Sequence, residues 1–380
     1  MDFSISIHDL SLFEQITIFI FLFAVIIQLA YYLLVFSRLA FYKTTTDQDA
    51  DKQPVSVVIS AHNEDYNLIN NLSAILNQDY PDFEVIVVNH ASSDDTTQIL
   101  IDFQRKHSHL KIVNIEQDLN FFKGKKFPLS IGIKSAKNEI LLLTDADCKP
   151  NSSNWITEMA TNYTTKTDVV LGYGPYNKSK GFLNTLIRYD TFMIAMQYFS
   201  LALMGKPYMG VGRNLSYRRS TFFKNKGFTS HYNISSGDDD LFIQQVANSK
   251  NTKIEISKNS FLYSQPKPTF NTWFNQKQRH FTTGSSYSTF FKIILATFSI
   301  SQFLFYLTFI TLLITGTLIA YTLIIMVVTM GIRVFIQKKA ASQLSENQLL
   351  LFSLFGDLLY VILMPIMTLI SLIRKRKSWS

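Results

Sequence analysis

The sequence predicts an α/β domain with a mainly parallel sheet, joined at both ends to apolar helices that span a membrane. Between residues 54 and 290, short runs rich in β-branched residues alternate with amphipathic helical patterns, which is typical of a parallel sheet covered on both faces. Long uncharged segments flank this region, and 47% of the 380 residues are hydrophobic, more than a soluble domain needs. We therefore expect an anchor, an α/β domain and a C-terminal membrane region.

The first apolar segment covers residues 16–36 and contains no charge. As a helix rising about 1.5 Å per residue it spans roughly 30 Å, the thickness of a bilayer core. Acidic residues precede it, and Arg38 and Lys43 follow it, which is the reverse of a signal peptide's charge pattern. Residues 1–43 are therefore predicted to be a transmembrane anchor with its N-terminus outside, and the polar segment 44–53 a linker.

The α/β domain is predicted over residues 54–290, with strands and helices that alternate along the chain. The predicted strands are 55–61, 83–88, 111–115, 139–143 and 168–171, and the predicted helices are 66–77, 95–107 and 125–136. Ligands of such sheets bind beyond the carboxyl ends of the strands. We therefore expect the functional residues there.

The C-terminal region, residues 291–380, is predicted to contain two to three apolar membrane segments. Residues 293–332 carry no charge and are long enough for two spans joined near 315–317. A third run, 349–373, carries only Asp357, but if it spans, the basic residues 374–377 lie on the side opposite the α/β domain, against the positive-inside rule. Two interpretations stay open: the run spans the membrane, or it is re-entrant or interfacial.

The net charge of +8 does not indicate nucleic-acid binding, because basic residues are common beside anionic lipid and no basic motif is interleaved with aromatics. We expect membrane lipid as a partner and no nucleic acid. The lone cysteine, Cys148, excludes an internal disulfide and a cysteine-based zinc site, which fits a reducing compartment. The predicted location is the cell membrane, multi-pass, with the α/β domain in the cytoplasm.

Polar residues cluster at the predicted strand ends, at 60–64, 89–95 and 144–148. Asp145 and Asp147 point the same way, because side chains in a strand alternate with a period of two. Two carboxylates suit Mg²⁺ or Mn²⁺, which prefer oxygen ligands. Neither a Gly-x-Gly-x-x-Gly turn nor a Walker loop is present, so a bound diphosphate would depend on metal and on Lys or Arg.

Over residues 54–290 the chain resembles the family 2 glycosyltransferases of GT-A fold, which have a Rossmann-type nucleotide-sugar domain. The resemblance is carried by seven motifs in the family's order, at residues 55–64, 92–96, 124–126, 145–147, 210–219, 237–241 and 276–280. It implies inverting transfer of a sugar from a nucleoside diphosphate sugar, with UDP favoured as the nucleotide. A hydrolase would instead need a carboxylate pair flanking the scissile bond.

The resemblance also implies a role for each site residue. Asp147 would bind the metal together with Asp145, which faces the nucleoside, and Asp238 would be the general base, with Asp239 as its rival. The other implied nucleotide-sugar contacts are Ala61, Glu64, His90, Lys125 and Arg279, and the implied acceptor contacts are Gln276 and His280. His90 stands where the family usually has Asp facing the base, and His280 where polymer-forming members usually have Trp.

Several of these residues have a structural alternative. The acidic run 238–240 also suits the start of a helix, where carboxylates complement the helix dipole. Arg213, Arg218 and Arg219 are either substrate contacts or a basic surface. Residues 273–274 are aromatic and fit an interface or a core better than a sugar platform.

The predicted function is metal-dependent transfer of a single sugar to a lipid or lipid-linked acceptor. Few predicted spans leave a narrow basis for a polysaccharide channel, so processive polymer synthesis is the alternative. A catalytically silent nucleotide-binding membrane protein is the alternative of another class. The sequence opposes it, because both the metal carboxylates and the candidate base are present.

Overall fold

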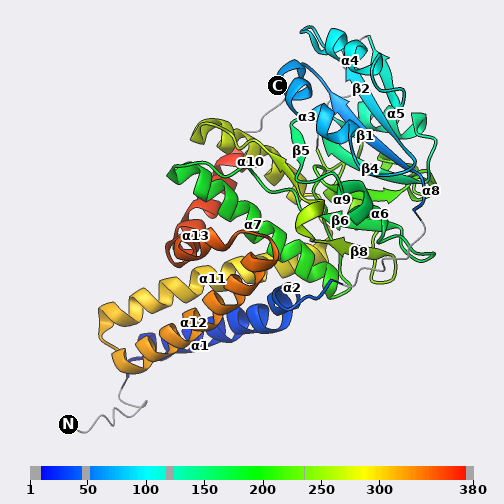
Figure 1. The fold of residues 1–380 in the computed structure, drawn as a ribbon. Helices are drawn as coiled ribbons and strands as arrows, with labels where there is room; N and C mark the ends of the chain where they lie inside the picture. The colour runs from blue at the N-terminus through cyan, green and yellow to red at the C-terminus, as the bar shows by residue number, and fades with distance from the viewer. Residues whose placement is uncertain (1–9, 45–51, 117–123, 235, 374–380) are drawn as a thin grey trace.

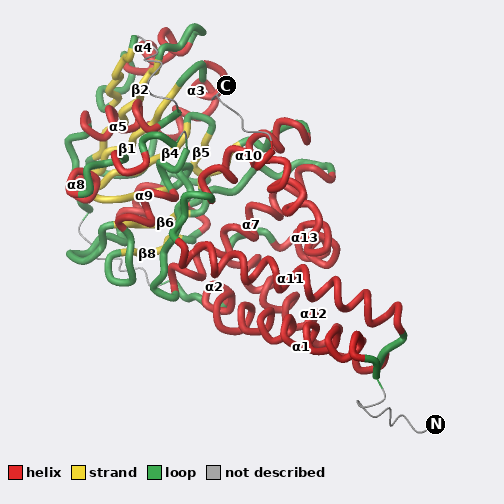
Figure 2. The backbone as a smooth tube through the Cα atoms, turned by 180° about the vertical axis from the view of Figure 1, so that it is seen from behind, coloured by secondary structure: helices red, strands yellow, loops and turns green. Residues whose placement is uncertain are grey.

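The computed structural model describes residues 10–44, 52–116, 124–234 and 236–373, and it comprises an α/β domain joined to a group of long helices (Figure 1). Most of the predicted linker and the basic residues 374–377 lie outside the described residues. Viewed from behind, the strands lie together at one end and the long helices extend away from them (Figure 2).

The main sheet has seven strands in the order β3-β2-β1-β4-β7-β6-β8. β7 is antiparallel to both its neighbours and the other pairings are parallel, so the predicted mainly parallel sheet is confirmed. The strands are β1 (Val55–Ala61), β2 (Phe83–His90), β3 (Leu110–Ile115), β4 (Ile140–Asp145), β6 (Val169–Gly172), β7 (Leu215–Arg218) and β8 (Thr252–Glu255). The five predicted strands correspond to β1–β4 and β6.

Both faces of the sheet are buried, which explains why its strands read as continuous apolar runs. Val57 and Ile59 belong to one core, with residues of α3 and α6, whereas Val58 belongs to a second core, with residues of α5 and α7. The helices of the domain are α3 (Asp65–Leu76), α4 (Thr96–Gln104), α5 (Lys126–Ser135), α6 (Trp155–Ala160), α8 (Arg219–Lys224) and α9 (Asp240–Val246). A small sheet pairs β5 (Cys148–Pro150) with β9 (Leu262–Ser264).

Within the described residues, four helical segments are long and apolar enough to cross a membrane. The first joins α1 (Leu12–Ala30) through a π-helix (Tyr31–Phe36) to α2 (Ser37–Ala40); the others are α11 (Thr289–Thr315), α12 (Ile319–Gln343) and α13 (Leu350–Ile373). Gly316 ends α11 with φ +74°, at the position where the sequence predicts a break in the long uncharged segment. α13 runs unbroken through Pro365, and in both views it lies nearer the α/β domain than the far end of the α1, α11 and α12 bundle (Figures 1 and 2).

Two further helices, α7 (Phe182–Leu203) and α10 (Phe270–Gly284), lie between the α/β domain and the long apolar helices (Figure 1). α7 is buried almost all round, because one side packs in the sheet's second core and another contacts α13. α10 is amphipathic, with Trp273 and Lys277 on its buried face. These two helices contribute to the contact between the α/β domain and the long apolar helices, together with residues of α2 and α12 that pack in the sheet's second core.

A buried polar cluster connects the long apolar helices to α7. Arg333 of α12 and Asp357 of α13 form an ion pair with 2.5 Å between Nη2 and Oδ2, and both residues are at most 1% exposed. The Tyr189 hydroxyl of α7 donates to the other oxygen of Asp357, and Gln337 donates to Tyr32 at 2.9 Å. An ionised group inside an apolar bundle needs such partners.

Asp357→Asn is expected to destabilise the fold by about 3–5 kcal/mol, because it leaves the Arg333 charge buried without a carboxylate. Thermal unfolding of the detergent-solubilised protein would measure this as a lower midpoint. The matched control is the double variant Arg333→Met with Asp357→Leu, which removes both charges and should unfold near the wild-type midpoint. An equal loss in the single and double variants would contradict the assignment.

Candidate active site

A cavity of about 1280 Å³ lies beyond the carboxyl ends of β1, β2 and β4 and extends between α7, α10, α11 and α13. It brings together residues from strand ends, loops and α10 that are far apart in the sequence. The predicted site residues that line it are Glu64, His90, Lys125, Asp145, Asp147, Asp238, Asp239, Gln276, Arg279 and His280. Ala61 is the exception, since its side chain is fully buried in a core of the sheet.

Hydrogen bonds between the loops after β1 and β2 shape one end of the cavity. Asn63 has φ +55°, and its backbone N–H donates to Ser92 Oγ at 3.0 Å while its side chain accepts from Ser93 N at 2.8 Å. Thr96 Oγ1 accepts from Glu64 N at 2.9 Å. The motif at 92–96 therefore acts through structure, because it fixes the loop that presents Glu64 to the cavity. Burial raises the pKa of Glu64.

The two lysines of the motif at 124–126 have different positions. Lys125 forms an ion pair with Asp145 at the rim of the cavity. Lys126 is 1% exposed, and its ammonium donates to His231 O at 2.6 Å and Ile234 O at 2.9 Å. Burial lowers the pKa of Lys126 to about 8. Lys126 therefore anchors the segment that precedes the acidic run at 238–240.

Asp145 and Asp147 fit a divalent cation. Their carboxylate oxygens and the Cys148 sulfur lie within 4.8 Å of one another. Cys148 is fully buried, burial raises the pKa of its thiol, and it donates to Asp147 Oδ1 at 3.3 Å, so it is a poor candidate for a ligand. Two carboxylates on an open rim suit Mg²⁺ or Mn²⁺, with substrate and water oxygens completing the shell.

The three consecutive aspartates after Gly237 have distinct environments. Asp239 caps α9 and accepts from Gly212 N at 2.9 Å and Asp240 N at 2.8 Å, and burial together with the Asp238 charge raises its pKa. Asp240 is buried and accepts from the Tyr287 hydroxyl at 2.6 Å. In the described part of the chain, no hydrogen bond or ion pair engages the Asp238 carboxylate. Gly237 has φ +93°, a backbone conformation that favours glycine, and it turns the chain into this run.

Asp240 gives a pH prediction. Burial, reinforced by the Asp239 charge, raises the pKa of Asp240 to about 8, so between pH 4 and 8 the folded protein holds a proton that the unfolded chain releases. Stability from this group is present at low pH and is lost as the pH rises through 8. The thermal midpoint of the wild type is therefore expected to fall relative to that of Asp240→Asn as the pH rises from 5 to 8, because the asparagine cannot titrate. Parallel midpoints across that range would refute the assignment.

Another wall of the cavity is formed by α10 and by aromatic and cationic groups. Gln276 donates to the Tyr176 hydroxyl at 3.1 Å, and the Arg213 guanidinium lies 4.2 Å from the centre of the same ring while donating to Ser264 Oγ at 2.7 Å. Trp273 is 1% exposed and packs in a core cluster with residues of α7 and α13. The core interpretation of Trp273 is therefore supported over the sugar platform.

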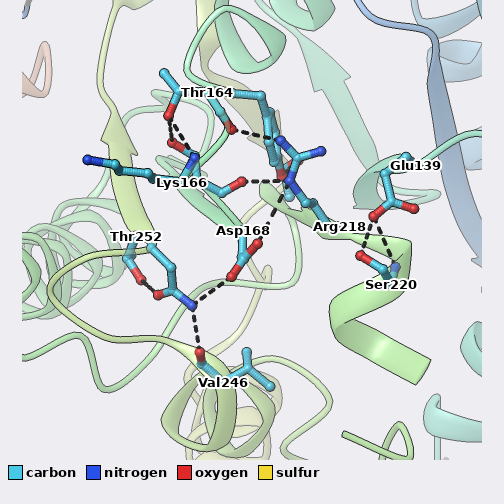
Figure 3. Close-up of polar contacts among 12 residues, drawn as sticks. Glu139, Thr164, Lys166, Asp168, Arg218, Ser220, Val246 and Thr252 are labelled. Atoms are coloured by element: carbon cyan, nitrogen blue, oxygen red, sulfur yellow. Dashed lines mark hydrogen bonds and ion pairs between the residues drawn. The ribbon is translucent and has the colours of Figure 1, made fainter. Parts of the chain in front are cut away.

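The three arginines of the motif at 210–219 separate. Arg213 lines the cavity. Arg218 lies at the far end of β7, where it donates to Thr167 O and Thr164 O at 2.8 Å and is 3.8 Å from Asp168. Figure 3 shows this group, and nearby the Ser220 hydroxyl donates to Glu139. Arg219 stacks on Phe223 at 4.8 Å. Arg218 and Arg219 thus stabilise loops and the end of the sheet, away from the cavity.

Several cavity residues were not predicted from sequence. Asp190 and Tyr198 come from α7, Lys267 from the loop after β9, and Tyr360 from α13. Arg213 was detectable because it lies inside a motif. The α7 residues had no such signal, since their partners are in other elements.

Comparison with known protein families identifies the family of this chain. The model of "Glycosyl transferase family group 2" matches residues 145–373, more than half of the chain, and that of "Glycosyl transferase family 2" matches residues 56–224. The chain belongs to glycosyltransferase family 2. The predicted resemblance and the GT-A-like fold are confirmed, and the protein is a glycosyltransferase.

Individual relatives are more distant. Over 93 residues the chain is 36% identical to the poly-beta-1,6-N-acetyl-D-glucosamine synthase of Staphylococcus epidermidis, and over 278 residues it is 27% identical to the probable glycosyltransferase YdaM of Bacillus subtilis. These matches cover 24% and 67% of this chain but only 21% and 62% of the relatives' own lengths. The mannosyltransferase PcManGT from Pyrobaculum calidifontis, solved with GDP-Man and Mn²⁺, has the same fold, with a TM-score of 0.56 and 18% identity over 93% of this chain and 99% of its own.

Proposed function

We propose that this glycosyltransferase transfers a sugar, with inversion, from a nucleoside diphosphate sugar to a lipid-linked acceptor. The observation that carries the proposal is the continuity of the cavity. It runs from the carboxylates at the strand ends to walls formed by Ile194 of α7 and by two of the long apolar helices, with Leu295 of α11 and Tyr360 and Thr368 of α13. An acceptor with a polar head and an apolar tail fits such a cavity.

The donor is assigned to the end lined by His90, Lys125 and Asp145. Asp147, with Asp145, would hold Mg²⁺ or Mn²⁺, which supplies positive charge to the diphosphate as it leaves. Lys125 and Arg279 add cationic charge at the same end. A relative of the same fold was solved with GDP-Man and Mn²⁺, which supports a metal and a sugar nucleotide as the class of ligand. UDP remains the favoured nucleotide.

Asp238 is assigned as the general base. An acceptor hydroxyl oxygen attacks the anomeric carbon from the side opposite the diphosphate, the bond from that carbon to the diphosphate oxygen breaks, and the hydroxyl proton passes to the Asp238 carboxylate. Asp238 suits this step because the other two aspartates are held by backbone N–H groups and a tyrosine. Gln276 and His280 of α10 are assigned to the acceptor.

The α/β domain is assigned to the cytoplasmic face of the cell membrane. Gln343, at the end of α12, donates to Tyr42 O at 2.9 Å, so the C-terminal ends of α2 and α12 are adjacent beside the domain. Basic residues gather at these ends, at Arg38, Lys43, Lys338 and Lys339. The positive-inside rule favours a cytoplasmic location for such a cluster.

Polymer synthesis is the rival function, favoured by the similarity to a polysaccharide synthase over a quarter of the chain. The deciding experiment uses membranes that carry the full chain, radiolabelled UDP-, GDP- and dTDP-sugars, and either Mn²⁺ or EDTA. Mn²⁺-dependent label in solvent-extractable lipid is the expected result. Label only in high-molecular-weight polymer would establish the rival instead, and no transfer from any donor would contradict both.

A further inference from the structure

Three consecutive residues of α7 each bind a different part of the molecule. Arg188 forms an ion pair with Glu346 in the connection between α12 and α13. Tyr189 donates to Asp357 of α13. Asp190 accepts from the Lys277 ammonium of α10 at 2.9 Å through each of its two carboxylate oxygens. Residues 188 and 189 of α7 therefore bind the region of α12 and α13, and residue 190 binds α10, a helix of the candidate active site.

The contact with Lys277 fixes the rotation of α10. Gln276, Arg279 and His280 are spaced i, i+3 and i+4 and share the face of α10 that lines the cavity. Trp273 and Lys277 are spaced i, i+4 and share the adjacent face, which also borders the cavity although the two residues are only 1% and 5% exposed. Trp273 packs in an apolar cluster, which restrains the distance between the helices but does not fix the rotation of α10 about its axis. The ion pair of Lys277 with both carboxylate oxygens of Asp190 is directional and fixes this rotation.

Asp190 is suited to this role by its surroundings. It is 4% exposed, so its pairing with Lys277 is little screened by water. The Tyr360 hydroxyl of α13 also approaches its carboxylate, which adds a contact from the membrane region to the same group. Because Asp190 contacts Lys277 of α10 and Tyr360 of α13, a shift of one of these helices changes the position of the other.

We propose that Asp190 is a positioning residue for sugar transfer: through Lys277 it sets the rotation of α10, so that the membrane helices packed on α7 determine where Gln276, Arg279 and His280 meet the substrate. This rests on the assignment of those α10 residues to the active site. It predicts a larger effect on turnover than on donor binding, because Arg279 is the one α10 residue assigned to the donor and the other residues assigned to it lie in the strand-end loops.

The test measures kcat, the donor KM and nucleotide binding for Asp190→Asn and Lys277→Met in membranes carrying the full chain. Both variants are expected to lower kcat about 100-fold, as a displacement of about 1 Å can do, and to change the donor KM and the Kd for the free nucleotide far less. Lys277→Arg, which can keep the pair, should retain most of the turnover. The matched control is Glu346→Gln, which breaks a buried ion pair of α7 that does not reach α10 and should retain wild-type kcat.

A double variant separates positioning from stability. Asp190→Leu with Lys277→Leu replaces the pair by apolar groups, which usually preserves or raises stability. We expect it to fold at the wild-type midpoint and still to lose turnover. Wild-type turnover in the double variant, or an equal loss of kcat in Glu346→Gln, would overturn the proposal. Because every value is relative to wild-type turnover, into lipid or polymer, these outcomes are independent of which acceptor proves correct.

Discussion

Asp147→Ala is expected to lower sugar transfer about a thousandfold or more. Asp147 is the carboxylate assigned to the metal, and removing it leaves the charge that develops on the departing diphosphate without its main compensation, a loss of several kcal/mol in transition-state stabilisation. The measurement is kcat at saturating donor over a range of Mn²⁺ concentrations. EDTA should reduce the wild type to the level of the variant.

The control for Asp147→Ala is Asp102→Ala. Asp102 is an exposed carboxylate on α4 that pairs with Arg105 at 3.2 Å and accepts from Gln98 Nε2 at 3.1 Å, both exposed residues close to it in the chain, so its loss should change neither turnover nor metal dependence. If Asp147→Ala kept wild-type turnover in EDTA, metal-assisted departure of the diphosphate would be excluded for this enzyme.

Asp238→Asn is expected to lower kcat about a thousandfold with little change in donor binding, because the amide cannot accept the proton of the acceptor hydroxyl. The same substitution at the two neighbouring aspartates provides matched controls. Asp240→Asn should retain turnover, since Asp240 is buried against Tyr287. Asp239→Asn should retain more turnover than Asp238→Asn, since an amide oxygen can still cap α9.

The pH dependence of kcat distinguishes the base from a structural role. Wild-type turnover should fall at low pH as the base becomes protonated, and the residual turnover of Asp238→Asn should lose that limb. If Asp239→Asn showed the larger loss and the flatter profile, Asp239 would be the base. The proposed site would then stand with the two carboxylates exchanged.

The sequence by itself predicted five of the seven strands of the main sheet, the long apolar helices and most of the candidate site. Strands that are buried on both faces have continuous β-branched runs in their sequence. Helices long and apolar enough to span a membrane have long uncharged segments, so both kinds of element can be recognised from local composition. The acidic and basic site residues lie inside short motifs at strand ends. Their common location then follows from the geometry of a parallel sheet, whose carboxyl ends meet on one edge.

Only the tertiary structure decided what each polar residue does. Nothing local distinguishes Arg213, which lines the cavity, from Arg218, which binds carbonyl oxygens of a loop. The sequence leaves Asp239 as a rival to Asp238, whereas the structure shows that Asp239 accepts from Gly212 N and Asp240 from Tyr287. The pairing of Asp190 with Lys277 joins residues 87 positions apart. Such contacts are set by how packed helices face one another, and a side chain's partner depends on that packing rather than on the residues beside it in the chain.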